Sequence, residues 1–199
     1  MTPPGAPGRL RTLWALVAPL VLAACGGARS PFVTPVTASG VFLAGYHPYW
    51  AGASWQAYPE GLLDEIYFFE LEVAADGSFL DRHGWPDEWR AMIEASLGGG
   101  TQVTPTVSMH DPTAFEALFV DPAAIGRLVD GVEGLLVETP GLAGVHLDFE
   151  VFQPVGLAAR DGFTAFVGRL RDRIKRLDPG LSLSVFTLAF DDDDAYNEG

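Results

Sequence analysis

The chain has 199 residues, an apolar fraction of 48% and a formal net charge of −14 at pH 7. This length suits one domain or slightly more, and the apolar fraction is ample for a packed core. The negative charge excludes nucleic acid as a partner, because phosphate binding needs a basic surface. Cys25 is the only cysteine, so a disulfide framework and a cysteine-based zinc site are also excluded.

The amino-terminal segment has the features of an export signal. A short basic region precedes an apolar run over residues 13–22, which is too short for an ordinary membrane-spanning helix. LAACG (22–26) resembles the lipobox of bacterial lipoproteins, in which the chain is cut before the cysteine and the thiol is acylated. We therefore predict a signal peptide over 1–24, a membrane anchor at Cys25 and a location in the cell envelope, outside the cytoplasm. The alternative is a plain secretory signal with an incidental cysteine, which would make the protein secreted.

Residues 25–40 are rich in Gly, Pro, Ser and Thr, which is typical of a flexible tether. From there to residue 199, predicted strands and helices alternate. The strands are expected over 41–47, 65–73, 101–109, 143–150 and 181–190. The helices are expected over 86–97, 122–137 and 161–177. This order indicates an α/β protein with a parallel sheet. An open doubly wound sheet and a closed barrel both fit, although no glycine-rich nucleotide motif follows any strand.

GVHLDFE (144–150) places His146, Asp148 and Glu150 on every second position. In a strand these side chains share one face, and the apolar residues between them share the other. On a buried parallel strand, three polar groups in a row are costly unless something uses them.

Two carboxylates at positions i and i+2 of a strand lie about 6.5–7 Å apart along the backbone, and their side chains can close this gap. Their repulsion and burial would raise the pKa of one of them. A carboxyl group of that kind can donate a proton near neutral pH, as glycosidic bond cleavage requires. The alternative is a structural pair satisfied by backbone amides or a lysine, and the spacing alone does not decide between the two.

AGVHLDFE (143–150) resembles the DGxDxDxE signature of glycoside hydrolase family 18, the chitinases and their relatives. It lies on the fourth predicted strand, where that family carries the signature. GYHPYW (45–50) and SVFTLAF (184–190) are similar to the first and fifth strands of the family. The resemblance covers about residues 41–190.

The resemblance implies a (β/α)8 barrel, of the TIM-barrel type, and a substrate-assisted retaining mechanism. Glu150 would protonate the leaving glycosidic oxygen, and the N-acetyl oxygen of the substrate would attack the anomeric carbon. Asp148 would orient the acetamido group and stabilise the oxazolinium cation. The substrate would then be a 2-acetamido sugar polymer such as chitin, peptidoglycan or an N-glycan core. No cofactor or metal is implied.

Ala143 and His146 stand where the signature has aspartates. His146 could hydrogen-bond to Asp148 and, if protonated, would favour its ionised form. Signatures with a different polar residue at this middle position occur in the branch of the family associated with bacterial cell walls and spores, which favours peptidoglycan.

Further polar and aromatic residues lie at predicted strand ends, where barrels carry their functional groups. Besides His146, the expected substrate-binding residues are Tyr46, Trp50, Glu70 and Ser108. Tyr49 and Trp55 could also stack on sugar rings, although core packing fits each aromatic residue equally well.

Two groups of polar residues suggest metal sites without matching a metal motif. His47, His110 and Asp111 end different predicted strands and lack a local metal-binding spacing, so we expect them to be polar lining. The aspartates 191–194 lack the spacing of an EF-hand and are expected to form a solvated loop.

A closed barrel takes roughly 200 residues or more, whereas residues 41–199 supply only five predicted strands and the helices between them. We therefore expect this sequence to hold the amino-terminal part of a barrel, truncated after the fifth strand. The alternatives to an enzyme are a non-catalytic sugar-binding lipoprotein on the same fold and an inactive fragment.

Overall fold

The computed structural model describes residues 40–187. The predicted signal peptide, Cys25, nearly all of the tether and the aspartates 191–194 lie outside the described residues. The strands are β1 (Ala44–Pro48), β2 (Glu65–Val73), β3 (Phe79–Asp81), β4 (Gln102–Met109), β5 (Gly144–Phe149) and β6 (Ser182–Val185). The helices are the 3-10 helix η1 (Tyr49–Ala57) and the α-helices α1 (Arg90–Gly98), α2 (Pro112–Val120), α3 (Pro122–Glu138) and α4 (Leu157–Leu177).

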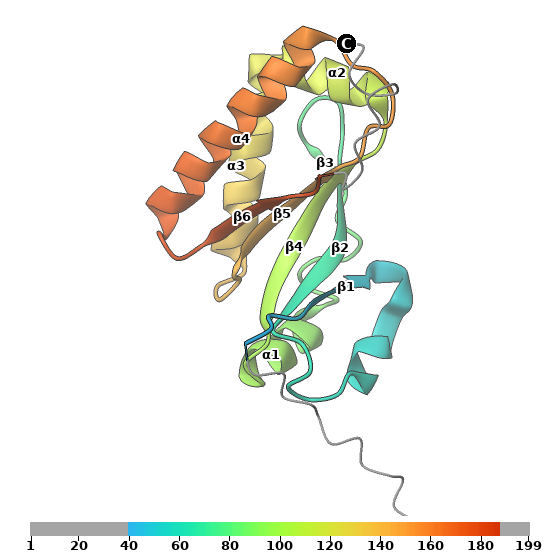
Figure 1. The fold of residues 1–199 in the computed structure, drawn as a ribbon, viewed down its shortest axis with the longest axis vertical. Coiled ribbons are helices and arrows are strands. Elements are labelled where there is room, and N and C mark those ends of the chain that lie inside the picture. The colour runs from blue at the N-terminus through green and yellow to red at the C-terminus, as the bar shows by residue number, and fades with distance from the viewer. Residues whose placement is uncertain (1–39, 188–199) are drawn as a thin grey trace, which may run out of the picture. The chain divides into compact units, whose positions relative to one another are not determined.

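The strands form one sheet in the order β1-β2-β4-β5-β6, and each neighbouring pair in this order is parallel. β3 adds an antiparallel pairing to β2. The helices between the parallel strands are the crossovers that parallel pairing requires, and α3 and α4 lie side by side along the sheet (Figure 1). The predicted α/β class and parallel sheet are therefore confirmed.

The two faces of the sheet differ in chemistry. The face that meets the helices is apolar, and Val107, Val145 and Leu147 are fully buried there in the same cluster as side chains of α2, α3 and α4. The other face carries a row of buried polar residues: Thr104, Thr106, Ser108, His146 and Asp148. This difference explains why polar and apolar residues alternate in GVHLDFE (144–150). Its apolar residues pack under the helices, and its polar residues point to the opposite face.

Three elements were not predicted: η1, β3 and α2. The signal for α2 is present in the sequence, because Asp111 is followed by a proline, as Asp121 is before α3. Each aspartate caps its helix: Asp111 accepts a hydrogen bond from the backbone N–H of Ala114 at 2.7 Å, and Asp121 accepts one from that of Ala123 at 2.8 Å. Asp111, expected as polar lining, is therefore a helix cap.

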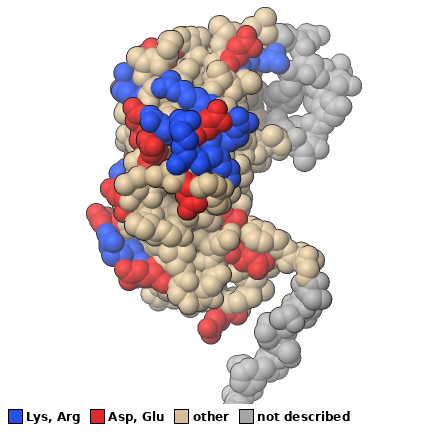
Figure 2. Space-filling model, turned by 90° about the vertical axis from the view of Figure 1, so that its left-hand side faces the viewer, with Lys and Arg blue, Asp and Glu red and all other residues tan. Residues whose placement is uncertain are grey.

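Several predicted boundaries shift. β1 begins at Ala44, because its pairing with β2 begins there, and α1 begins at Arg90 after a series of turns. α4 begins at Leu157, earlier than expected. The second half of α4, from 169 to 176, is rich in Lys and Arg. Figure 2 shows that Lys and Arg side chains gather on one face of the molecule. In the described range, no helix combines the length and apolar character needed to cross a bilayer.

β2 changes its alternation in the middle. Ile66 and Phe68 face the helices, and strict alternation would place Glu70 on that side as well. The register with β4 shifts between Phe68 and Leu71, and after the shift Leu71 is fully buried in the apolar cluster. Glu70 consequently lies on the polar side, next to His110.

Candidate functional site

A cavity of about 320 Å³ opens where the carboxyl ends of β1, β2, β5 and β6 come together. Its lining residues are Tyr46, Pro48, Trp50, Phe69, Asp148, Glu150 and Phe186. Four of the predicted site residues, Tyr46, Trp50, Asp148 and Glu150, are therefore brought together in one hollow. Functional groups of parallel α/β folds gather at this end of the strands.

Asp148 is the carboxyl group that the fold perturbs most clearly. It is 5% exposed, and its burial, followed by the charge of Glu150, raises its pKa to about 6. Within this value, nearby His110 lowers the pKa and Glu70 raises it, each to a smaller extent than Glu150 does. The raised pKa expected for one member of the pair thus falls on Asp148, which is protonated in a substantial fraction of molecules near pH 6.

His146 does not make the expected hydrogen bond to Asp148. Its Nε2 hydrogen-bonds with the hydroxyl of Tyr46 at 2.9 Å, and its Nδ1 with the hydroxyl of Ser184 at 2.8 Å. Both ring nitrogens are thereby used. Burial also lowers the pKa of His146, so at neutral pH the ring is uncharged and does not favour the ionised form of Asp148. That expectation was wrong, because Tyr46 of β1 and Ser184 of β6 are the partners of the two ring nitrogens.

Glu70 and Ser108 border Asp148 without lining the cavity. Glu70 is 8% exposed, and its Oε2 lies 3.1 Å from Nε2 of His110. Ser108 is opposite Asp148 in the register of β4 and β5. Its side chain is fully buried, and its hydroxyl has no hydrogen-bond partner among the described residues.

The aromatic residues separate into two groups. Trp50 is 65% exposed on the cavity and lies edge-on to Phe69, with ring centroids 5.8 Å apart. An exposed indole beside carboxylates suits sugar stacking rather than core packing. In contrast, Trp55 packs against the apolar core, and Tyr49 stacks on the ring of His83 at 3.5 Å between centroids.

His47, His110 and Asp111 do not come together as a metal site. His47 is fully buried, and its Nε2 donates to the carbonyl oxygen of Gly52 at 3.1 Å. Nδ1 is therefore the acceptor in the 2.8 Å hydrogen bond with the hydroxyl of Tyr58. Burial lowers the pKa of His47, so this ring is a neutral structural group.

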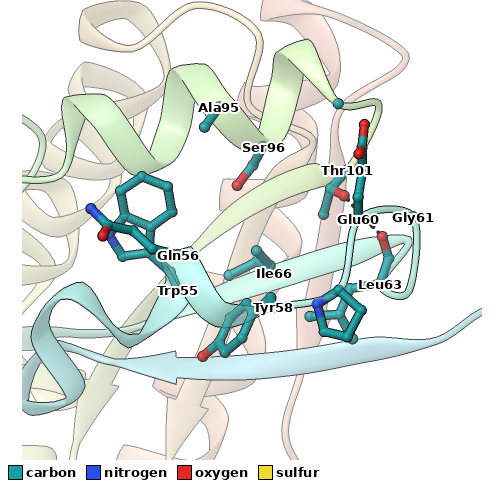
Figure 3. Close-up of a pocket in the computed structure, with 12 residues that line it drawn as sticks. Trp55, Gln56, Tyr58, Glu60, Gly61, Leu63, Ile66, Ala95, Ser96 and Thr101 are labelled. Atoms are coloured by element: carbon teal, nitrogen blue, oxygen red, sulfur yellow. Dashed lines mark hydrogen bonds between the residues drawn. The ribbon is translucent and has the colours of Figure 1, made fainter. Parts of the chain in front are cut away.

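A second cavity, of about 200 Å³, lies near the amino ends of β2 and β4. Trp55, Tyr58 and Leu63 line it together with Ala95 and Ser96 of α1 (Figure 3). Trp55, considered above for sugar stacking, lines it, whereas none of the predicted catalytic or substrate-binding residues does. It is therefore separate from the carboxylate cavity at the other strand ends.

The sequence interpretation missed several residues of the site. Phe69 and Phe186 were read only as parts of strands, yet both line the cavity. Ser184 was also missed, although it holds His146. The alternation of Ser184 and Phe186 along the last predicted strand is a signal that could have placed both on the polar face. No comparable signal exists for Phe69, since it lies at the register shift of β2.

No protein-family model matches the chain, and no curated protein matches it by sequence. Solved structures do resemble it. The C-terminal domain of a Desulfitobacterium hafniense DCB-2 protein assigned as a chitinase is 19% identical, with a TM-score of 0.62 over 72% of this chain and 45% of that one. A Bacillus subtilis protein assigned as the sporulation-specific glycosylase ydhD is 27% identical, with a TM-score of 0.50 over 60% of this chain and 38% of that one.

A class V chitinase from Nicotiana tobaccum, solved in complex with NAG4, is 12% identical, with a TM-score of 0.59 over 72% of this chain and 43% of that one. The chain thus spans less than half of the length of each of these three structures. Together with the parallel sheet and its crossover helices, the likeness shows that the described residues form part of a (β/α)8 barrel of the kind found in chitinases.

Proposed function

We propose that the chain belongs to a retaining glycoside hydrolase that cleaves N-acetylglucosamine-containing polysaccharide. The observation that carries this proposal is the position of Asp148 and Glu150. Both line one cavity at the carboxyl ends of parallel strands, beside an exposed tryptophan. The raised pKa of Asp148 also supports the proposal, because strongly shifted carboxyl groups are typical of sites where charge changes during a reaction.

In the proposed reaction the two carboxyl groups have different roles. Glu150 gives its proton to the glycosidic oxygen as the bond to the anomeric carbon breaks. The carbonyl oxygen of the 2-acetamido group forms a bond to that carbon, which gives a cyclic oxazolinium ion. Asp148 stabilises the positive charge at the acetamido nitrogen. Glu150, now ionised, then takes a proton from the water that opens the ring, and the configuration at the anomeric carbon is retained.

The substrate class follows from this nucleophile, because only a sugar with a 2-acetamido group can supply it. Chitin and peptidoglycan both contain such sugars. The NAG4 complex of the tobacco chitinase supports the first, and the likeness to a glycosylase assigned to sporulation supports the second. We propose peptidoglycan as the substrate, since the polar His146 in the middle of the motif also agrees with cell-wall relatives.

The test replaces Glu150 by Gln, which keeps the shape of the side chain and removes the proton. Hydrolysis of N-acetylglucosamine oligomers should fall by about 10²-fold or more, the scale of a general-acid contribution, while oligomer binding is largely kept. Asp87→Asn is the matched control, because its side chain is 83% exposed and lies outside the cavity lining. Full activity of Glu150→Gln would contradict the proposal.

The sugar provides a second control. Oligomers in which a hydroxyl replaces the 2-acetamido group lack the nucleophile and should not be cleaved. Equal cleavage of glucose oligomers would exclude the substrate-assisted mechanism while leaving another hydrolase mechanism open.

A non-catalytic sugar-binding protein is the second candidate function. The observation that favours it is His146, which bonds with Tyr46 and Ser184 and leaves Asp148 without the partner expected at that position. Such a protein would bind N-acetylglucosamine oligomers without cleaving them. Two results together would support this function over hydrolysis. The wild-type chain should bind the oligomers without cleaving any of them, and Trp50→Ala should weaken that binding.

We also propose that the protein is held outside the cytoplasm by a lipid on Cys25. The lipobox-like sequence at residues 22–26 supports this. An envelope polysaccharide would be within reach of an enzyme anchored in this way.

A further inference from the structure

A cluster of metal-binding residue types lies beside the catalytic cavity. Glu70, Glu72 and His83 each offer one ligand atom, and these atoms all lie within 4.8 Å of one another. The two glutamates come from the end of β2, and the histidine comes from the loop after β3. Such a group of three atoms fits around a single cation, which is typically held at about 2.0–2.2 Å from each nitrogen and oxygen ligand.

The imidazole of His83 is held in a fixed orientation. Its ring stacks on Tyr49 with 3° between the planes, and its backbone carbonyl accepts a hydrogen bond from the indole N–H of Trp89 at 2.8 Å. Nε2 faces Glu72 at 2.9 Å, whereas Nδ1 faces the carboxylate of Asp81 at 3.6 Å. A carboxylate on the far nitrogen of a histidine is the usual support of a metal-binding imidazole.

The surroundings of the cluster also favour a cation. Glu70 is 8% exposed, and a buried carboxylate needs a positive partner. The ion pairs that Glu70 and Glu72 make among the described residues are both with histidines, which carry charge only when protonated. In addition, Ser108 is opposite Glu72 in the register of β2 and β4, and its fully buried hydroxyl has no partner in the described part of the chain.

We propose that Glu70, Glu72 and His83 bind a divalent first-row transition metal ion, with Zn²⁺ as the best fit. One imidazole and two carboxylates suit Zn²⁺, whereas Ca²⁺ and Mg²⁺ prefer oxygen ligands alone. The site is distinct from the residues proposed for hydrolysis, since none of its three ligands lines the cavity of Asp148 and Glu150. It does not depend on the proposed hydrolase function.

Titration calorimetry of the full-length protein, first freed of metal with a chelator, tests the site. Zn²⁺ should bind with a stoichiometry of one. His83→Gln and Glu72→Gln should each weaken Zn²⁺ binding by at least about tenfold, and Asp81→Asn by about tenfold, the lower end of the effect of removing a supporting residue. Glu94→Gln is the matched control, since Glu94 is an exposed carboxylate on α1, and it should bind Zn²⁺ as the wild type does.

Melting curves without metal show which variants fold. Zn²⁺ binding is then compared between the wild type and those variants that have the wild-type melting temperature. Titration of the wild type with Co²⁺ gives a readout that needs no variant: visible absorption bands should appear and saturate at one equivalent. Three results would each overturn the proposal: no Co²⁺ bands, equal Zn²⁺ binding by the folded variants and the wild type, or Ca²⁺ binding as tight as Zn²⁺ binding.

Discussion

Asp148 and Glu150 are two residues apart and differ in environment. Asp148 lines the cavity but is only 5% exposed, whereas Glu150 follows the last residue of β5 and is partly exposed. The charge of Glu150 is a cause of the raised pKa of Asp148, after burial. Two carboxyl groups of one strand can therefore take different roles, because burial falls mainly on one of them.

The pKa of Asp148 predicts how stability changes with pH. The folded-state value of about 6 lies above the ordinary 3.8, so the fold favours the protonated form. Its contribution to stability is fully present below about pH 3.8 and is lost as pH rises through about 6. Asp148→Asn removes the charge, and should raise the free energy of unfolding at pH 8 by up to about 3 kcal/mol relative to the wild type.

Urea unfolding of both proteins at pH 8 and at the lowest pH near 4 where both still fold would measure this. The difference between them should shrink as pH falls, because Asp148 is then neutral in the wild type too. A difference of the same size at both values would show that the effect comes from packing rather than from the charge.

At the scale of elements, β5 is held from its apolar side by α2 and α4. Phe149 lies near Phe119 and Phe163, with ring centroids 5.6 Å and 5.5 Å away. Gly162 of α4 lets the two helices approach closely: a Cβ there would stand 1.8 Å from the carbonyl oxygen of Phe119. This close approach positions the strand that carries the motif.

We expect substitution by alanine to have opposite effects on stability at two glycines of α4. Gly168 has open space around its position, so Gly168→Ala should stabilise the protein by about 0.5–1 kcal/mol through helix propensity. Gly162→Ala should destabilise it by about 1–3 kcal/mol, because the added methyl forces α4 away from α2. Thermal or urea unfolding of the two variants measures both effects, and a stabilising Gly162→Ala would contradict the close packing.

At the scale of the whole molecule, the parallel order of the strands collects residues from distant parts of the chain. Tyr46, Asp148 and Phe186 are far apart in the sequence and line one cavity. β4 and β5 carry buried polar groups on one face and apolar groups toward the helices. The ligands of the proposed metal site come from the end of β2, which supplies Glu70 and Glu72, and from the loop after β3, which supplies His83.

The proposed lipid anchor at Cys25 concerns the whole molecule and can be tested by cell fractionation. Cys25→Ala removes the thiol that would be acylated, so the protein should leave the membrane fraction or remain unprocessed. Metabolic labelling with a fatty acid should be lost at the same time. Unchanged labelling of Cys25→Ala would show that the lipobox assignment is wrong.

The α/β class, the parallel strands and the strand that carries Asp148 and Glu150 could all be predicted from the sequence. These features could be predicted because they depend on local patterns. A period of two marks a strand, and the Asp-Pro pair at residue 121 marks the start of a helix. The Asp-Pro pair at residue 111 likewise marks the start of α2.

Three features of the site depend on tertiary contacts: which carboxyl group has the raised pKa, which partners His146 takes and where Glu70 points. The first depends on burial, the second on hydroxyl groups supplied by β1 and β6, and the third on a register shift between β2 and β4. None of these is encoded within a short stretch of sequence. Each is set by contacts between residues that the chain brings together only when the sheet has formed.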